Sequence, residues 1–313
     1  MVNQTNIEKL FDVLDESAII LYERYKLPYL EGLIKTCENI ISDSVNEDFT
    51  EKSEILRDKL DRLKDIEFQK EEIRKAFQYA CLKGFKHKNI TNQMITPDSI
   101  GIFLSYLIDK LYLKKKLTIL DPLVGTGNLI TTIANQREDD VNLIGVDNEM
   151  NSYMLSQALF DMLGYGDKVF YQDTLTYSGP ESDVIVTDFS GIEMDEIFKI
   201  IKHQRNNIAD NGFLMGIIDN NFFDDDKLSE FINEVKQEWH FFGLVVLPKQ
   251  FFKYHGKSIL ILQNIGEGFI KPKTFMMAEI PSFEKKEEML KVINRLNQWF
   301  KDTEFKRVGD NNL

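Results

Sequence analysis

Residues 118–129 read TILDPLVGTGNL, an apolar run that ends in a carboxylate, passes through two glycines and leads into a helical pattern. An acid at a strand end, a glycine turn and a helix start are typical of the first unit of an open α/β sheet. Glycines let the backbone approach a ligand, and the free N–H groups of the helix start face the same crevice. The stretch predicts a binding crevice formed by Asp121, Pro122, Gly125, Thr126, Gly127 and Asn128.

Short apolar runs alternate with helical patterns on both sides of this stretch. Strands are expected at residues 118–121, 143–147, 168–171, 183–188, 213–219, 242–247 and 258–263, and helices at 128–136, 149–163, 192–203 and 224–238. Such alternation indicates an α/β fold with a doubly wound, mostly parallel seven-stranded sheet. The last two runs are too closely spaced for a parallel crossover, so we expect an antiparallel edge strand. An edge segment at 274–280 and a terminal helix at 284–300 should follow.

The first ninety residues have a different pattern, because their apolar positions recur at helical spacing. One helix should end or kink at Pro28, a second should cover residues 29–42, and a long charged helical stretch should run over 51–85. The narrow apolar stripe of that last stretch needs a partner surface. We therefore divide the chain into a helical module at residues 1–90, which could also receive a protein partner, and a ligand-binding domain at 91–313.

Composition and charge narrow the classes of function. The 313 residues are 43% hydrophobic, which excludes collagen-like, mucin-like and disordered chains. Two distant cysteines and four scattered histidines argue against a metal site and against a secreted disulfide framework. The sequence shows no signal-like start and no run of about 18 apolar residues, so we expect a cytoplasmic protein without a membrane partner. A net charge of -13 disfavours unaided binding of phosphate backbones.

Three acids, Asp121, Asp147 and Asp173, follow successive predicted strands, at the sheet edge where open α/β sheets bind ligands. Asp147 suits the two hydroxyls of a ribose. A dinucleotide would need a third glycine where Ile130 stands, and Asp121 would repel its pyrophosphate. The same carboxylate suits the ammonium of an amino-acid moiety, which favours S-adenosyl-L-methionine over NAD. A glycine turn with ordinary helix-capping acids is the simpler alternative.

Two motifs resemble those of class I S-adenosylmethionine-dependent methyltransferases of the adenine-N6 DNA type. Residues 121–129 look like the motif D-P-x-x-G-[ST]-G-x-[FL], and QMITP at 93–97 is similar to the Q-x-x-T-P segment of type I restriction modification subunits. The resemblance covers roughly residues 87–265 and, with the helical beginning, extends to small relatives in Gram-positive bacteria. It implies a methyltransferase domain at 91–313.

The resemblance also implies a role for individual residues of the cofactor site. Thr96 and Pro97 would lie along the methionine part, and the turn from Asp121 to Gly127 would hold the amino-acid end. Asp147 would bind the ribose and Asp173 the adenine amino group. Three neighbours complete the expected site, namely Asn128, Asn148 and Thr174.

The loop after the fourth predicted strand departs from the family pattern. Family enzymes carry [DN]-P-P-[YF], in which the first residue and a backbone carbonyl accept the N–H hydrogens of an extruded adenine and the aromatic ring stacks on it. Residues 188–191 read DFSG here, so both prolines are gone and Gly191 stands in the aromatic place. The predicted catalytic residues are Asp188 as hydrogen-bond acceptor, Phe189 as a ring that would stack in a rearranged loop, and the adjacent Ser190. The alternative for Asp188 is a helix cap.

The sequence thus predicts an S-adenosylmethionine-dependent N-methyltransferase similar to adenine-N6 DNA methyltransferases. A catalytically impaired methyltransferase-fold protein that works by binding, and a methyltransferase acting on RNA or protein, remain as alternatives. DNA is a partner that the acidic charge and the short tail after Gln263 disfavour, unless a partner subunit supplies the missing contacts. Asn220, Asn221, Phe222 and Phe223 could line the cleft for the methyl acceptor, although the acids at 224–226 favour an ordinary helix start there. A second group could hold a base or phosphate, or belong to an ordinary hairpin loop: Lys249, Tyr254, His255 and Lys257.

Overall fold

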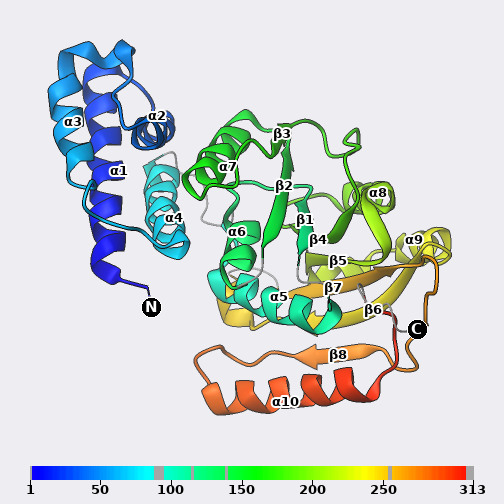
Figure 1. Ribbon diagram of the computed structural model, residues 1–313. Helices are drawn as coiled ribbons and strands as arrows, with labels where there is room; N and C mark the ends of the chain where they lie inside the picture. Colours follow the sequence, from blue (N-terminus) through cyan, green and yellow to red (C-terminus); the bar gives the residue numbers. More distant parts are fainter. Residues whose placement is uncertain (1, 88–94, 114–115, 138–139, 253–255, 308–313) are drawn as a thin grey trace.

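A computed structural model describes residues 2–87, 95–113, 116–137, 140–252 and 256–307, and shows a group of helices beside a twisted α/β sheet (Figure 1). The N-terminal helices are α1 (Gln4–Tyr25), α2 (Tyr29–Ser42), α3 (Ser53–Asp61) and α4 (Lys70–His87), with a 3-10 turn at Glu47–Lys52. Pro28 stands immediately before α2, which confirms the predicted break between the first two helices.

The charged stretch at 51–85 is two helices instead of the single one expected. Residues 62–69 form the turn between α3 and α4. The turn reverses the chain, so that α4 packs against both α1 and α2. Leu63, Phe68 and Ile73 pack against the core of the module, and their burial accounts for a break that helical spacing alone does not reveal.

The remaining chain forms one eight-stranded sheet in the order β3-β2-β1-β4-β5-β7-β6-β8. Its first five strands are parallel, β7 runs antiparallel between β5 and β6, and β8 pairs parallel with β6 at the edge. The predicted doubly wound sheet with an antiparallel end is confirmed, and the expected edge segment supplies the eighth strand. The strands are β1 (Leu117–Asp121), β2 (Val141–Asp147), β3 (Val169–Tyr171), β4 (Ser182–Asp188), β5 (Ile208–Asp219), β6 (Trp239–Val246), β7 (Lys257–Asn264) and β8 (Met276–Glu279).

Helices cover both faces of this sheet (Figure 1). They are α5 (Asp98–Leu111), α6 (Asn128–Asn135), α7 (Met150–Met162), α8 (Met194–Gln204), α9 (Leu228–Val235) and α10 (Lys286–Asp302). Pro97 precedes α5, as its fixed φ favours at a helix start. Helix α9 is shorter than the predicted 224–238, because the chain first makes a 3-10 turn at Asn220–Asp224.

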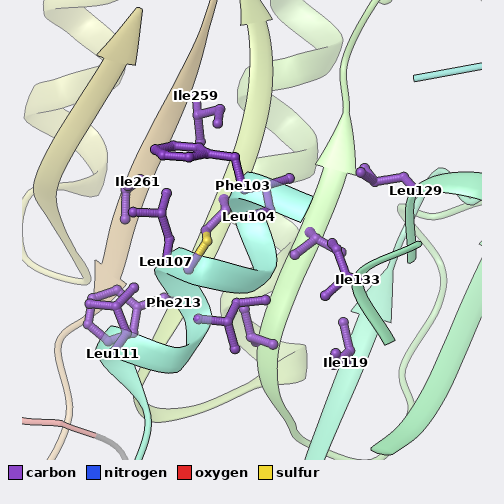
Figure 2. Close-up of a cluster of buried hydrophobic side chains, with 14 of the residues drawn as sticks. Phe103, Leu104, Leu107, Leu111, Ile119, Leu129, Ile133, Phe213, Ile259 and Ile261 are labelled. Atoms are coloured by element: carbon purple, nitrogen blue, oxygen red, sulfur yellow. The ribbon is translucent and has the colours of Figure 1, made fainter. Parts of the chain in front are cut away.

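Two apolar clusters, one on each face, hold the sheet between its helices. Figure 2 shows the first, in which side chains of α5 and α6 meet those of β1, β5 and β7. The second lies under α8 and α9. A third cluster joins the helical module to the sheet domain, because side chains of α1, α2 and α4 pack against Leu155 and Leu159 of α7. Helix α6 also packs against β1 and β4, and α7 packs against β2.

Candidate active site

The glycine turn between β1 and α6 opens toward the ends of the parallel strands. Gly125 and Gly127 have φ angles of 54° and 77°, a region that favours glycine. The N–H of Gly125 donates to Oδ2 of Asp147 at 2.9 Å, which ties the turn to the end of β2. A Cβ atom on Gly125 would meet only the carbonyl of Leu123 at 4.0 Å. The backbone therefore borders open space on that side, as close approach by a ligand requires.

Asp121, at the end of β1, is a buried carboxyl group with only 1% of its surface exposed. Burial raises its pKa to about 8, and the nearby charges of Asp147 and Asp188 add to the effect, while the N–H of Leu123, which donates to Oδ1 at 3.1 Å, opposes it. A desolvated carboxylate is stabilised by a cation placed against it. The residues present therefore fit the ammonium end of an amino-acid ligand.

The other two strand-end acids are more accessible. Asp147 accepts the N–H of Gly125 through Oδ2 and that of Glu149 through Oδ1, at 2.9 and 2.8 Å, and burial raises its pKa. Asp173 and Asn148 are exposed, and Asp173 caps the N–H of Leu175 at 2.8 Å. Each ionised carboxylate keeps free lone pairs for ribose hydroxyls or an amino group.

Thr174 does not fit the expected cofactor site through its side chain. It is buried, with 6% of its surface exposed, and its hydroxyl accepts a hydrogen bond from Nε2 of Gln204 at 3.1 Å. Since Gln204 is itself fully buried, the Thr174 hydroxyl serves the packing of α8. We therefore retain only Asp173 from this pair as a candidate ligand contact.

Thr96 connects the segment before α5 to both the glycine turn and the loop after β4. Its hydroxyl donates to Oδ2 of Asp188 at 2.7 Å, and its carbonyl accepts from Nδ2 of Asn128 at 3.0 Å. The structure thus brings Thr96, Asn128 and Asp188 together from three distant parts of the chain. Gln93 and Met94 of the predicted motif lie outside the described residues.

The loop after β4 places Asp188 and Phe189 on opposite sides of the sheet. Oδ1 of Asp188 accepts from the N–H of Ser190 at 3.0 Å and also from its hydroxyl. The expectation that Phe189 stacks on a substrate is wrong, because its ring is buried, 2% exposed, in the cluster under α8 and α9.

The reason for this correction is the period of the strand. The N–H of Phe189 donates to the carbonyl of Ile217 at 2.9 Å, so the pairing of β4 with β5 continues one residue beyond Asp188. Consecutive side chains of a strand point to opposite faces. Gly216 leaves room for the ring, since a Cβ atom there would lie 2.6 Å from Cε2 of Phe189.

Lys257, the first residue of β7, places its ammonium group beside the loop that follows β4. It lies opposite Asp219 in the pairing of β5 with β7, and its side chain is only 13% exposed. Its Nζ atom lies 3.6 Å from Oδ1 of Asp219 and 4.0 Å from Oδ1 of Asp188, and it donates to the hydroxyl of Ser190. The sequence offered Lys257 only as one member of a mixed group.

The other members of that group are divided by the structure. Phe222 is fully buried, so it does not line a cleft. Oδ1 of Asn220 accepts a hydrogen bond from the hydroxyl of Ser258 at 2.8 Å, next to Lys257 in the sequence. Asn221, Phe223 and Lys249 are exposed. Tyr254 and His255 lie outside the described residues.

A buried arginine of the helical module is the site residue that sequence reasoning missed. Arg74 of α4 is 0% exposed and donates from Nη1 to Oδ1 of Asn128 at 2.6 Å. It also donates to both oxygens of Asp98, at 3.0 and 3.1 Å, and to Glu71 at 2.6 Å. Burial alone would raise the pKa of Asp98, but the hydrogen bonds and charges of Arg74 and Lys75 outweigh it and hold that pKa well below its usual range.

No group of three or more His, Cys, Asp or Glu side chains in the part of the chain that the structure describes is arranged to hold a metal ion. None of the helices described there is long and apolar enough to cross a membrane.

Comparison with known proteins gives the same fold and adds a family. The family described as the YtxK N-terminal helical domain matches residues 8–85. The uncharacterized protein YtxK of Bacillus subtilis (strain 168) is 30% identical over 326 aligned residues, which cover 96% of this chain and 99% of that protein. A proposed class I S-adenosylmethionine-dependent methyltransferase of Listeria monocytogenes has a solved structure that is 29% identical, with a TM-score of 0.85, covering 95% of this chain and all of that one.

More distant structures share the fold alone. The modification subunit of a proposed type I restriction enzyme from Vibrio vulnificus is 16% identical, with a TM-score of 0.58, over 81% of this chain and 64% of its own. A type I restriction-modification methyltransferase subunit from Streptococcus thermophilus is 12% identical with the same TM-score, over 92% and 74% of the two chains. The chain therefore has the fold of S-adenosylmethionine-dependent methyltransferases.

Proposed function

The chain belongs to the YtxK family, and on that premise we propose that it binds S-adenosylmethionine at the strand ends and transfers the methyl group to an amino nitrogen. One observation carries the proposal: the buried acid Asp121, the turn-bound acid Asp147 and the loop acid Asp188 converge beside a glycine turn whose backbone at Gly125 borders open space. S-adenosylmethionine would bring its ammonium group to Asp121, its ribose to Asp147 and its transferable methyl group near Asp188.

Each proposed contact rests on the chemistry of the side chain. Asp121 faces the ammonium group, the N–H groups of the turn at Gly125–Asn128 approach the carboxylate, and Asp147 with Asn148 accepts the ribose hydroxyls. Asp173 receives the adenine amino group, while Thr96 and Pro97 border the methionine chain. Bound S-adenosylmethionine would supply an electrophilic methyl group on its sulfonium. Asp188 accepts an N–H hydrogen bond from the acceptor and so keeps the nitrogen lone pair directed for attack.

Adenine-N6 in DNA is the acceptor that we propose for this site. The likeness to type I restriction-modification subunits and the acceptor Asp188 support it. The net charge of -13 opposes strong contact with phosphates, so we further propose that a partner protein, received by the exposed side of the helical module, supplies the contacts to DNA.

A second function, cofactor binding without catalysis, is favoured by one observation. Phe189 is committed to the core, and Asp188 is already hydrogen-bonded by Thr96 and Ser190 and faced by Lys257. In this case the protein would respond to S-adenosylmethionine as a ligand. The two functions differ in a single measurable property, the release of the methyl group.

Calorimetric titration with S-adenosylmethionine, followed by transfer of a tritiated methyl group to DNA, RNA or lysate protein, tests both. Binding with transfer to adenine in DNA supports the first proposal, and binding without any transfer supports the second. Asp188→Ala should abolish transfer and leave cofactor affinity nearly unchanged, while Asp121→Asn should weaken binding. If the wild-type chain binds no S-adenosylmethionine, both proposals fail.

A further inference from the structure

The helical module reaches the cofactor crevice through one fully buried side chain. Arg74 projects from α4, and its guanidinium contacts Glu71 on its own helix, Asp98 at the start of α5 and Asn128 at the start of α6. An arginine with 0% exposure requires partners for its charge and its donors, and these contacts supply them. The charge therefore fixes α4 to the first turns of two helices of the other domain.

Those two first turns are the ones that border the proposed cofactor. Asn128 directly follows Gly127 of the glycine turn, and it is 5% exposed, with its Oδ1 atom held by Arg74. Its Nδ2 atom donates to the carbonyl of Thr96 at 3.0 Å, and the Thr96 hydroxyl in turn donates to Asp188 at 2.7 Å. A hydrogen-bonded series thus runs from Arg74 through Asn128 and Thr96 to Asp188.

We propose that Arg74 is a positioning residue for S-adenosylmethionine. It acts by holding Asn128 and Thr96 in place, so the helical module supports the cofactor site without touching the cofactor. The inference rests on the proposed binding site. Without Arg74, the amide of Asn128 can rotate and the Thr96 segment loses its fixed place beside the glycine turn. The proposal gives the module a role besides that of a surface for partners.

Thermodynamic linkage supplies a second consequence. If docking of α4 raises the affinity for S-adenosylmethionine, then bound S-adenosylmethionine must strengthen the docking of α4 by the same factor. The amide hydrogens of α4 and α5 should then exchange more slowly when the ligand is present. Hydrogen exchange detects this effect without any methyl transfer.

The test compares Arg74→Met and Arg74→Lys with Lys83→Met in the full-length chain. Lys83 lies on the same helix and pairs with Asp15 of α1 at 2.6 Å, so its loss weakens the module without touching the series to Asp188. We expect Arg74→Met to raise the dissociation constant for S-adenosylmethionine about tenfold or more, Arg74→Lys to recover part of that loss, and Lys83→Met to change it less than about threefold. Ligand-dependent protection of α4 should disappear only in Arg74→Met.

A second variant tests the inference in case Arg74→Met does not fold. Asn128→Asp keeps an oxygen toward Arg74 but removes the donor to Thr96, so it should lower the affinity while α4 stays docked. Equal affinity in wild type, Arg74→Met and Asn128→Asp would overturn the inference and leave the proposed function intact. Equal losses in Arg74→Met and Lys83→Met would also overturn it, because a general loss of stability would then explain both. If the wild type binds no ligand, the proposed function fails first.

Discussion

The hydroxyl of Thr96 donates to Oδ2 of Asp188 at 2.7 Å, a contact between residues 92 positions apart in the sequence. It joins the segment in front of α5 to the loop that follows β4. Both residues are largely removed from water, with Thr96 8% exposed and the Asp188 side chain 19% exposed. The orientation of the proposed acceptor carboxylate therefore depends on a residue expected to border the cofactor.

Replacement of Thr96 by Val should expose this dependence. The variant keeps the shape of the side chain but leaves an oxygen of Asp188 without its donor. Hydrogen bonds to charged groups contribute about 1.5–3 kcal/mol, so we expect the free energy of unfolding to fall by a similar amount, as measured by urea denaturation. Thr96→Ser keeps the hydroxyl and serves as the control. Unchanged stability in Thr96→Val would show that the bond contributes nothing.

Replacement of Asp121 by Asn should stabilise the ligand-free protein at high pH. The folded chain holds the proton of Asp121 up to a pKa of about 8, whereas the unfolded chain releases it near the ordinary value of 3.8. The contribution of Asp121 to the free energy of unfolding is therefore fully present below about pH 4, and it is lost as the pH rises through about 8.

The measurement is thermal unfolding of both proteins at pH 5, 7 and 9. The melting temperature of Asp121→Asn should exceed that of wild type by a margin that grows with pH, since Asn carries no charge to desolvate. The matched change at an exposed carboxyl, Asp173→Asn, is the control. A margin that is constant with pH would contradict the raised pKa of Asp121.

Variants of Phe189 should behave as core variants and not as active-site variants. Removing a buried aromatic ring costs about 3–5 kcal/mol, so Phe189→Ala should lose that much free energy of unfolding, while Phe189→Leu should lose about 1.5 kcal/mol or less. Phe189→Leu should bind S-adenosylmethionine as the wild type does. A Phe189→Leu protein of normal stability with lost methyl transfer would restore the stacking role that the structure argues against.

The two cysteines should be chemically silent in the native protein. Cys37 and Cys81 are both fully buried, and burial raises the pKa of each thiol, so little of the reactive thiolate is present. A colorimetric thiol reagent should react with neither group in the folded chain and with both after denaturation. Rapid labelling of either cysteine before unfolding would show that the helical module opens readily.

Patterns that repeat along the chain were sufficient to predict most of the fold. Alternation of apolar runs with helical patterns gave the doubly wound sheet, and the short connection between 242–247 and 258–263 gave its antiparallel end, as β6 and β7 confirm. The acids at strand ends were predictable for the same reason, because parallel strands bring their carboxyl ends to one edge. Their roles toward a cofactor stay predictions.

What the sequence could not provide were facts set by pairing between distant residues. The direction of Phe189 depends on how far β4 keeps its pairing with β5 and on the space left by Gly216. Arg74 looks like one more charge on a charged helix until α4 is placed against α5 and α6. Lys257 faces Asp188 only because β7 is inserted beside β5. None of these relations leaves a periodic signal.

The burial of Arg74 also limits how the helical module and the sheet domain can be separated in evolution. A gene fragment that starts near residue 91 would encode a sheet with its glycine turn intact, yet Asp98 would lose Arg74, Lys75 and Gln78 together. The boundary expected near residue 90 therefore does not separate two independent units. An exchange of either part for that of another protein would preserve these contacts only if Arg74 and its acceptors, Asp98 and Asn128, were transferred together.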